Sequence, residues 1–356
     1  MNNKISLRLI KERFNEFGLE YETIDLQNGF SILCSEQGGR IFGPFENDES
    51  ESIFWISDVF ANSEIFGAFL KEGGWNLGGD RVWISPEIPF FTKNKEDFFN
   101  TYTVQKELDP GSYKLIKKDN TISMFQNVTI ESYADEYKNK KFSIGKNVFL
   151  AEDPLRVLDR YSQLSKDVKY CGFQQNITLN AKDEDKSTYL ETWVLTQINP
   201  SGTLVVPFLG DLEFVNYYEP ISQNLFRLED NHINVSVTGD VRYKLGFKAA
   251  QMTGRAGYFG KLGSGSDYLL IRNYYNNPSN VYCSGPYRAP HNFGCSMFLY
   301  NDSGSQGGFA EFENSGKTIS GDTGLIESID NVSYYLYVGN KLKLNEISNA
   351  LLGVCL

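Results

Sequence analysis

Residues 73–87, GGWNLGGDRVWISPE, place four glycines next to charged and aromatic residues that could bind a small polar ligand. A phosphate-binding P-loop requires a Lys and then a Ser or Thr after its last glycine, whereas Asp80 and Arg81 follow Gly79. A dinucleotide site requires Gly-x-Gly-x-x-Gly between a strand and a helix, but the chain continues as VWISP, which alternates as a strand does. Both kinds of nucleotide site are therefore excluded here.

The alternation after Gly79 predicts a strand that presents side chains on two faces. Successive strand residues point to opposite faces, so Arg81 and Trp83 would share one face and Asp80 would lie on the other. Pro86 would end the strand and place Glu87 at its mouth. A guanidinium, an aromatic ring and a carboxylate gathered in this way are typical of a site that binds hydroxyl groups.

Titratable residues that could exchange protons with a ligand are few. Glu311 and Glu313 are two residues apart in AEFENS and would share one face of a strand. His232 and His291 are the only histidines. The flanking residues predict a surface turn for His232, whereas His291 lies in a loop that precedes an apolar strand, close to Arg288. Such loops often carry functional side chains.

The strands that would position these residues make up most of the chain. Short segments rich in Val, Ile, Tyr, Phe and Thr, separated by turn residues, predict an all-β protein, a large antiparallel β-sandwich. Helical spacing of apolar residues predicts a helix over 6–18 and a second near 344–352. We expect residues 1–20 to pack as a helical segment on a single domain of residues 21–356, with a hairpin loop at 181–187.

Composition excludes several partners. Of the 356 residues, 34 are Lys or Arg and 45 are Asp or Glu, and the resulting net charge of −11 argues against nucleic acid or an anionic membrane surface. The five cysteines are far apart, without Cys-x-x-Cys spacing, which predicts reduced and mostly buried thiols. The N-terminal residues carry charges within their apolar pattern, so we expect no secretory signal and a cytoplasmic protein. We expect neither a metal nor a cofactor.

Four stretches, taken in order, resemble the galactose mutarotase-like (aldose 1-epimerase-like) superfamily. They are GGRIFGPF (38–45), GGDRVWISPE (78–87), LETWVLTQINPSGTLVVPF (190–208) and GGFAEFENSGKTISGD (307–322). The second resembles a segment of uncharacterised branches of the superfamily and is the most distinctive. The resemblance implies a β-supersandwich that binds a small carbohydrate on a concave face.

The resemblance also implies roles for individual residues. In authentic epimerases a late-strand Glu is the base and mid-chain histidines are the acid and oxygen clamp, but the corresponding segment here, YCGFQQNITLN (170–180), has no histidine. A carboxylic acid with a raised pKa could replace them. The catalytic candidates are therefore Glu313, Glu87 and His291. The candidates for contacting substrate are Arg40, Asp80, Arg81, Trp83, Trp193, Gln197, Arg288 and Glu311.

Each candidate also has a structural explanation. Arg81 could pair with a buried carboxylate, Glu87 could cap a turn or pair with a Lys, and Trp193 could belong to the core. Arg40 could lie at a strand edge, and Glu311 and Glu313 could face solvent. Three functions therefore stay open: interconversion of the anomers of a hexose or hexose phosphate, sugar binding without turnover, and a purely structural β-domain.

Overall fold

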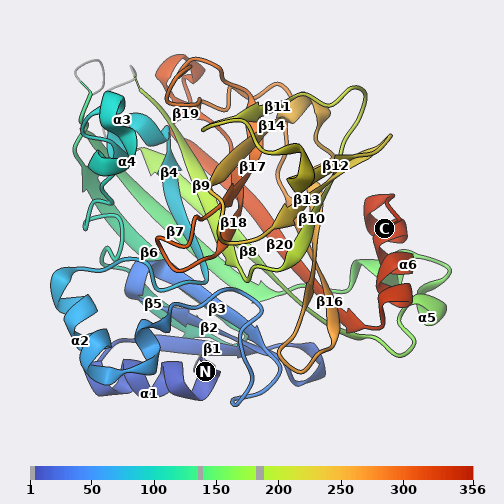
Figure 1. The fold of residues 1–356 in the computed structure, drawn as a ribbon. Helices are drawn as coiled ribbons and strands as arrows, with labels where there is room; N and C mark the ends of the chain where they lie inside the picture. The colour runs from blue at the N-terminus through green and yellow to red at the C-terminus, as the bar shows by residue number, and fades with distance from the viewer. Residues whose placement is uncertain (1–4, 135–138, 182–187, 356) are drawn as a thin grey trace.

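Two antiparallel sheets of ten strands each pack against one another in the computed structural model, which describes residues 5–134, 139–181 and 188–355 (Figure 1). The first sheet has the order β1 (Tyr21–Asp25), β2 (Ser31–Ser35), β3 (Arg40–Phe45), β4 (Asp80–Ser85), β9 (Tyr189–Ile198), β18 (Ala310–Ser315), β17 (Cys295–Asn301), β14 (Tyr243–Lys248) and β11 (Phe214–Asn216), with β19 (Ile319–Ser320) paired to β9. The second has the order β12 (Phe226–Leu228), β13 (His232–Val237), β10 (Gly202–Pro207), β15 (Arg255–Lys261), β16 (Asp267–Tyr274), β20 (Glu327–Gly339), β8 (Lys169–Ala181), β7 (Lys140–Leu150), β6 (Thr121–Ile130) and β5 (Lys114–Lys118).

The predicted antiparallel β-sandwich is confirmed. Within residues 190–208 the chain leaves β9 of the first sheet and enters β10 of the second. The chain therefore crosses from one sheet to the other at this point. The hairpin loop expected at 181–187 lies outside the described residues except for its first residue, Ala181.

Both predicted terminal helices are present. The first, α1 (Leu7–Phe17), begins at the N-cap Ser6, whose side chain accepts a hydrogen bond from the backbone N–H of Leu9, and ends at Gly18 in the left-handed conformation. The last, α6 (Lys341–Leu352), has Asn340 as its N-cap. Between them the chain also forms short helices that the sequence did not predict: α2 (Ser63–Glu72), α3 (Glu87–Phe91), α4 (Phe98–Thr101) and α5 (Tyr161–Leu164).

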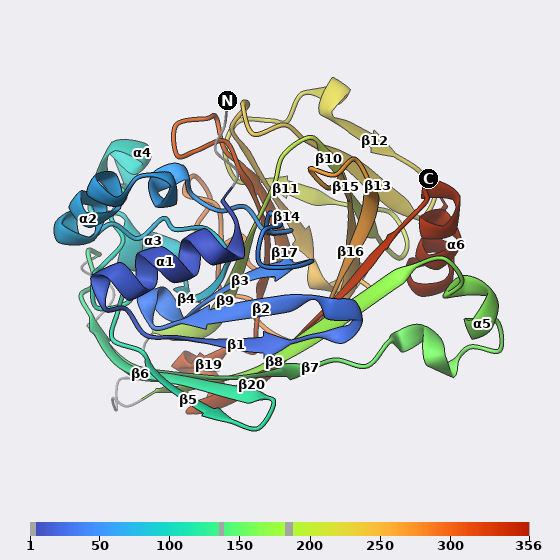
Figure 2. The same ribbon diagram turned by 90° about the horizontal axis from the view of Figure 1, so that it is seen from below.

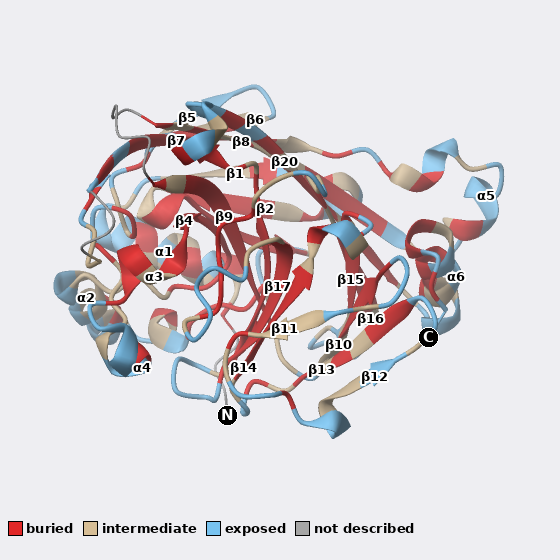
Figure 3. Cartoon of the chain, turned by 90° about the horizontal axis from the view of Figure 1, so that it is seen from above, coloured by how far each residue is buried: buried red, intermediate tan, exposed pale blue. Residues whose placement is uncertain are grey.

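The main hydrophobic core lies between the two sheets, and smaller clusters lie under the terminal helices (Figures 2 and 3). Phe14 of α1 packs with Phe42, Phe60 and Phe66 at one edge of the first sheet. Leu344 and Ile347 of α6 pack in a cluster that also contains Leu269 of β16. Each terminal helix thus covers apolar surface that a bare sheet would leave in water.

Charged side chains also lie inside the sandwich. Asp80 of β4 is fully buried and accepts hydrogen bonds from Gln175 at 2.9 Å, Thr196 at 2.9 Å and Tyr334 at 2.6 Å, with the ammonium of Lys146 at 3.4 Å. Gln175, Tyr334 and Lys146 belong to β8, β20 and β7 of the second sheet. This carboxylate therefore ties the two sheets together through their polar side chains.

The structure also bears on the expectations for His232 and for the cysteines. His232 is buried at the start of β13, so the predicted surface turn was wrong; its ring nitrogens lie 2.8 Å from Asn231 Oδ1 and 3.3 Å from Asn234 Nδ2. All five cysteines are free thiols; four of them are buried and Cys355 is exposed. Within the part of the chain that the structure describes, no helix combines the length and apolarity needed to cross a membrane.

We predict that Asp80→Asn lowers the free energy of unfolding by about 3–5 kcal/mol, because it leaves the buried Lys146 ammonium without its carboxylate. Urea unfolding followed by tryptophan fluorescence measures the change. The exposed Asp159→Asn is the matched control and should stay within about 0.5 kcal/mol of wild type. Equal stabilities for the two variants would contradict the structural role of Asp80.

Candidate functional site

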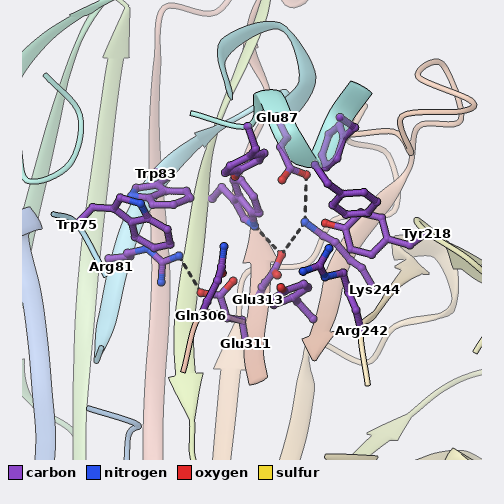
Figure 4. Close-up of a pocket in the computed structure, with 15 residues that line it drawn as sticks. Trp75, Arg81, Trp83, Glu87, Tyr218, Arg242, Lys244, Gln306, Glu311 and Glu313 are labelled. Atoms are coloured by element: carbon purple, nitrogen blue, oxygen red, sulfur yellow. Dashed lines mark hydrogen bonds and ion pairs between the residues drawn. The ribbon is translucent and has the colours of Figure 1, made fainter. Parts of the chain in front are cut away.

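A pocket opens on the face of the first sheet that is turned away from the second sheet (Figure 4). Its cavity volume is about 90 Å³. Aromatic and charged side chains line it together: Trp75, Arg81, Trp83, Glu87, Phe98, Phe99, Tyr102, Trp193, Tyr218, Arg242, Lys244, Tyr300, Gln306, Glu311 and Glu313. Three are carboxylates and three are cations, so the pocket is polar at its centre despite its aromatic walls.

Strand register explains why residues from distant parts of the sequence meet here. Directly paired residues of antiparallel strands lie on the same face. Trp83 of β4 is paired with Trp193 of β9, and Glu311 of β18 with Tyr300 of β17, which is paired in turn with Lys244 of β14. Five adjacent strands therefore present their pocket residues side by side. Glu87 reaches the same space from the first turn of α3, just after β4 ends.

Glu313 and Glu87 share one cation, the Lys244 ammonium. Lys244 Nζ lies 3.1 Å from Glu87 Oε2 and 3.5 Å from Glu313 Oε2. The indole N–H of Trp193 donates to the same Glu313 oxygen at 2.8 Å. Glu87 lies on one side of the ammonium and Glu313 on the other, as the dashed lines in Figure 4 show. The three groups form one electrostatic unit, in which protonation of one carboxylate changes the charge felt by the other.

Burial controls the protonation of Glu313. Removal from water raises the pKa of its carboxyl group to about 7, and the opposing attraction of Lys244 only partly offsets the effect. Glu311 and Glu87 act in the same direction as burial because they add negative charge nearby. The pKa of Lys244 is raised by Glu313 and Glu87, against the effect of its own burial, which would lower it. The site thus holds a carboxyl group able to gain or lose a proton near neutral pH.

Arg81 and the tryptophans form the opposite wall. The Arg81 guanidinium lies 4.1 Å from the ring centre of Trp83 and 5.2 Å from that of Trp75, and its Nη2 pairs with Glu311 Oε1 at 2.7 Å. Lys244 Nζ similarly lies 4.4 Å from the ring of Trp193. These ring faces are therefore already in contact with cations. The sequence placed Arg81 and Trp83 on one face, and the structure shows in addition that the guanidinium of Arg81 covers the ring of Trp83.

A buried pair behind this wall holds Trp83 in place. Asp109 Oδ2 accepts the indole N–H of Trp83 at 2.9 Å and a hydrogen bond from Arg40 Nη2 at 2.7 Å. Arg40 Nη1 also donates to the carbonyl of Gly78 at 2.8 Å. Burial lowers the pKa of Arg40 to about 10, with Asp109 opposing the change. Arg40 thus supports the pocket from behind and does not line it.

Several polar atoms of the pocket residues lack partners among the described residues. They include Glu313 Oε1, Arg81 Nη1 and Nε, and Arg242 Nε, all of which are shielded from solvent. Buried polar groups in proteins are almost always hydrogen-bonded. Donors and acceptors left unpaired in one pocket are the groups that a polar ligand would satisfy.

Of the residues singled out from the sequence, the structure brings six into this pocket: Arg81, Trp83, Glu87, Trp193, Glu311 and Glu313. It places the other five elsewhere. Arg40 and Asp80 are buried in the ion pairs described above, and Gln197 is buried with its Nε2 donating to Asn76 Oδ1 at 2.9 Å. Arg288 is exposed and pairs with Glu219 at 2.6 Å, and His291 lines a neighbouring pocket. We therefore leave these five out of the proposed catalytic and binding groups of this pocket.

The sequence analysis missed Lys244, Arg242 and most of the aromatic wall. Lys244 had a detectable signal, since it stands between Tyr243 and Leu245 in an apolar strand where a charge requires a buried partner. Phe98, Phe99 and Tyr218 had none, because they lie in connecting segments whose folding over the sheet is a tertiary property.

Comparisons with known proteins found one family and several solved structures that are similar to this chain. The model of a family of unknown function, DUF6786, matches residues 19–356. A structure from Salmonella typhimurium, classed by its name as a mutarotase (YeaD), is similar at a TM-score of 0.49 and 10% identity, covering 90% of this chain and 91% of that one. One from Klebsiella pneumoniae, classed by its name as an aldose 1-epimerase, has a TM-score of 0.44 and 8% identity, covering 95% and 84%. No curated protein matches. At these identities, the function of this chain is inferred from its own residues.

The raised pKa of Glu313 predicts a specific pH dependence of stability. Its folded-state pKa of about 7 lies above the ordinary value of 4.5, so the protonated form is favoured by folding. The contribution is fully present below pH 4.5 and is lost as the pH rises through about 7. We therefore expect the difference in unfolding free energy between wild type and Glu313→Gln to shift against wild type over this interval. Denaturant titrations at several pH values measure it.

The exposed Glu213→Gln provides the control for this titration. It should keep the pH profile of wild type, because it leaves Glu313 in place. Parallel profiles for wild type and Glu313→Gln would show that the carboxyl of Glu313 does not titrate between these two pH values.

Proposed function

We propose that this chain, which belongs to the DUF6786 family of unknown function, binds a carbohydrate in the pocket around Glu313 and interconverts its anomers. The ligand is a hexose or a hexose phosphate. The observation that carries the proposal is the state of Glu313: a buried carboxyl group with a pKa of about 7 and one unpartnered oxygen, in a pocket walled by aromatic rings.

Anomer interconversion requires proton exchange at two oxygens of the sugar. A base removes the proton of the anomeric hydroxyl while an acid protonates the ring oxygen, the bond between the anomeric carbon and the ring oxygen breaks, and the open-chain aldehyde forms. Reclosure on the other face of the carbonyl gives the second anomer and returns both protons. Glu313 and Glu87 are the proposed pair, since they flank Lys244 and can each exchange a proton with one sugar oxygen.

The remaining pocket groups would orient the sugar. Arg81 Nη1 and Arg242 Nε are donors without a hydrogen-bond partner in the described part of the chain, suited to hydroxyl or phosphate oxygens. Lys244 would keep the two carboxylates apart and limit the build-up of negative charge. The aromatic walls would pack against the C–H faces of the ring and exclude water.

One observation favours a second candidate, sugar binding without turnover. Neither histidine lies in this pocket: His232 is in β13 and His291 lines the neighbouring pocket. The acid chemistry then depends on carboxyl groups alone.

Ligand-observed NMR with α and β hexoses and hexose phosphates separates the two functions, with anomer exchange followed in the same samples. We expect exchange faster than the buffer blank, reduced at least about 100-fold in Glu313→Gln and in Glu87→Gln, the typical contribution of a general acid or base. Glu213→Gln should retain the wild-type rate.

Binding without accelerated exchange would support the non-catalytic sugar-binding protein. The absence of any binding across the panel would overturn the proposed function. Exchange that survives both substitutions would reject Glu313 and Glu87 as the proton-transfer pair while leaving sugar binding intact.

A further inference from the structure

A second and larger cavity adjoins the pocket around Glu313. Its volume is about 540 Å³, against about 90 Å³ for the first. Glu87 lines both cavities, so the two lie next to each other at the start of α3. Their walls are also joined by a stack, because Phe98 of the first lies 5.2 Å from Tyr287 of the second with nearly parallel rings. We call the larger one the α3 cavity.

The sizes of the cavities bear on the size of the ligand. Pockets that bind small molecules usually measure about 300–1,000 Å³. The pocket around Glu313 is below this range, whereas the α3 cavity lies within it. A ligand confined to the first pocket would leave the adjoining space to solvent. A ligand that spans both would use the protein-lined volume on each side of Glu87.

The walls of the α3 cavity have the chemistry of a saccharide subsite. Tyr133 and Tyr287 supply rings, Pro86 and Pro89 supply rigid apolar surface, and Lys93 lies at the rim as a hydrogen-bond donor. Rings and apolar surface pack against the C–H faces of sugars, while isolated polar groups bind the hydroxyls. The lining of the α3 cavity is neither wholly apolar nor wholly charged, and this mixture fits a neutral polyhydroxy ligand.

Thr92 gives an independent indication of a ligand. It lines the α3 cavity, is only 4% exposed, and its Oγ1 is buried without a hydrogen-bond partner among the described residues. An unpaired buried hydroxyl costs free energy unless something else satisfies it. A ligand hydroxyl in this cavity would do so.

We infer that the α3 cavity is a second saccharide subsite, and that the hexose beside Glu313 is the reducing-end ring of a disaccharide or longer oligosaccharide. The next ring passes Glu87 and occupies the α3 cavity. This inference rests on the proposed function, because it assigns the first ring to the pocket around Glu313.

The test compares reducing disaccharides with their own reducing-end hexoses by ligand-observed NMR titration. We expect the best disaccharide to bind at least about 10-fold more tightly than its hexose, equivalent to about 1.4 kcal/mol. Thr92→Val should weaken disaccharide binding about 3- to 10-fold, the value of one hydrogen bond, and leave hexose binding unchanged. Folding should tolerate it, because the lost hydroxyl has no protein partner.

Thr121→Val is the matched control, since Thr121 lines neither cavity. His291→Trp is a second test that adds bulk to the exposed rim of the α3 cavity and should also weaken disaccharides selectively. Hexose binding with no gain for any disaccharide would overturn the second subsite while leaving the proposed function in place. Failure of both hexoses and disaccharides to bind would overturn the proposed function and this inference with it.

Discussion

The carboxylate of Asp80, enclosed between the two sheets, is the constraint on which the rest of the site depends. Its partners Gln175, Tyr334 and Lys146 all come from the second sheet. Side chains of a strand alternate between faces, and a slip of one residue would turn this charge away from its partners and into the wrong layer. The register of β4 is therefore fixed, and Arg81 and Trp83 are directed to the opposite face, where the pocket lies.

The pairing of buried charges also determines how the pocket is arranged. Three carboxylates and three cations are gathered under aromatic rings, and charges taken out of water are tolerated only when they are paired. Arg81 pairs with Glu311, and Lys244 serves Glu87 and Glu313 together. Burial raises the pKa of Glu313, and the one ammonium that it shares with Glu87 offsets this effect only in part. The acid–base capacity of this group near neutrality therefore follows from burial with incomplete charge compensation.

The segment after β4 converts a sheet face into a binding site. From Glu87 to Asp109 it forms α3 and α4, and it contributes Glu87 and Phe98 to the pocket and Thr92 to the adjoining α3 cavity. It then returns to Asp109, which holds the indole of Trp83 in place. The segment from Glu87 to Asp109 thus encloses the pocket around Glu313, forms part of the α3 cavity and holds Trp83 in the pocket wall.

The sequence by itself determined the antiparallel strands, the terminal helices and the opposite orientations of Asp80 and Arg81, because these follow from local periodicity. It also selected Glu87, Trp193, Glu311 and Glu313, which the fold brings together in one pocket. Only the tertiary structure decided that Arg40 lies behind the pocket, that Gln197 pairs with Asn76 and does not line the pocket, that His291 lines the α3 cavity, and that Lys244 joins two carboxylates. Those outcomes depend on which strands are neighbours and on how connecting segments fold over the sheet. Local sequence patterns carry no information on contacts between residues more than a hundred positions apart.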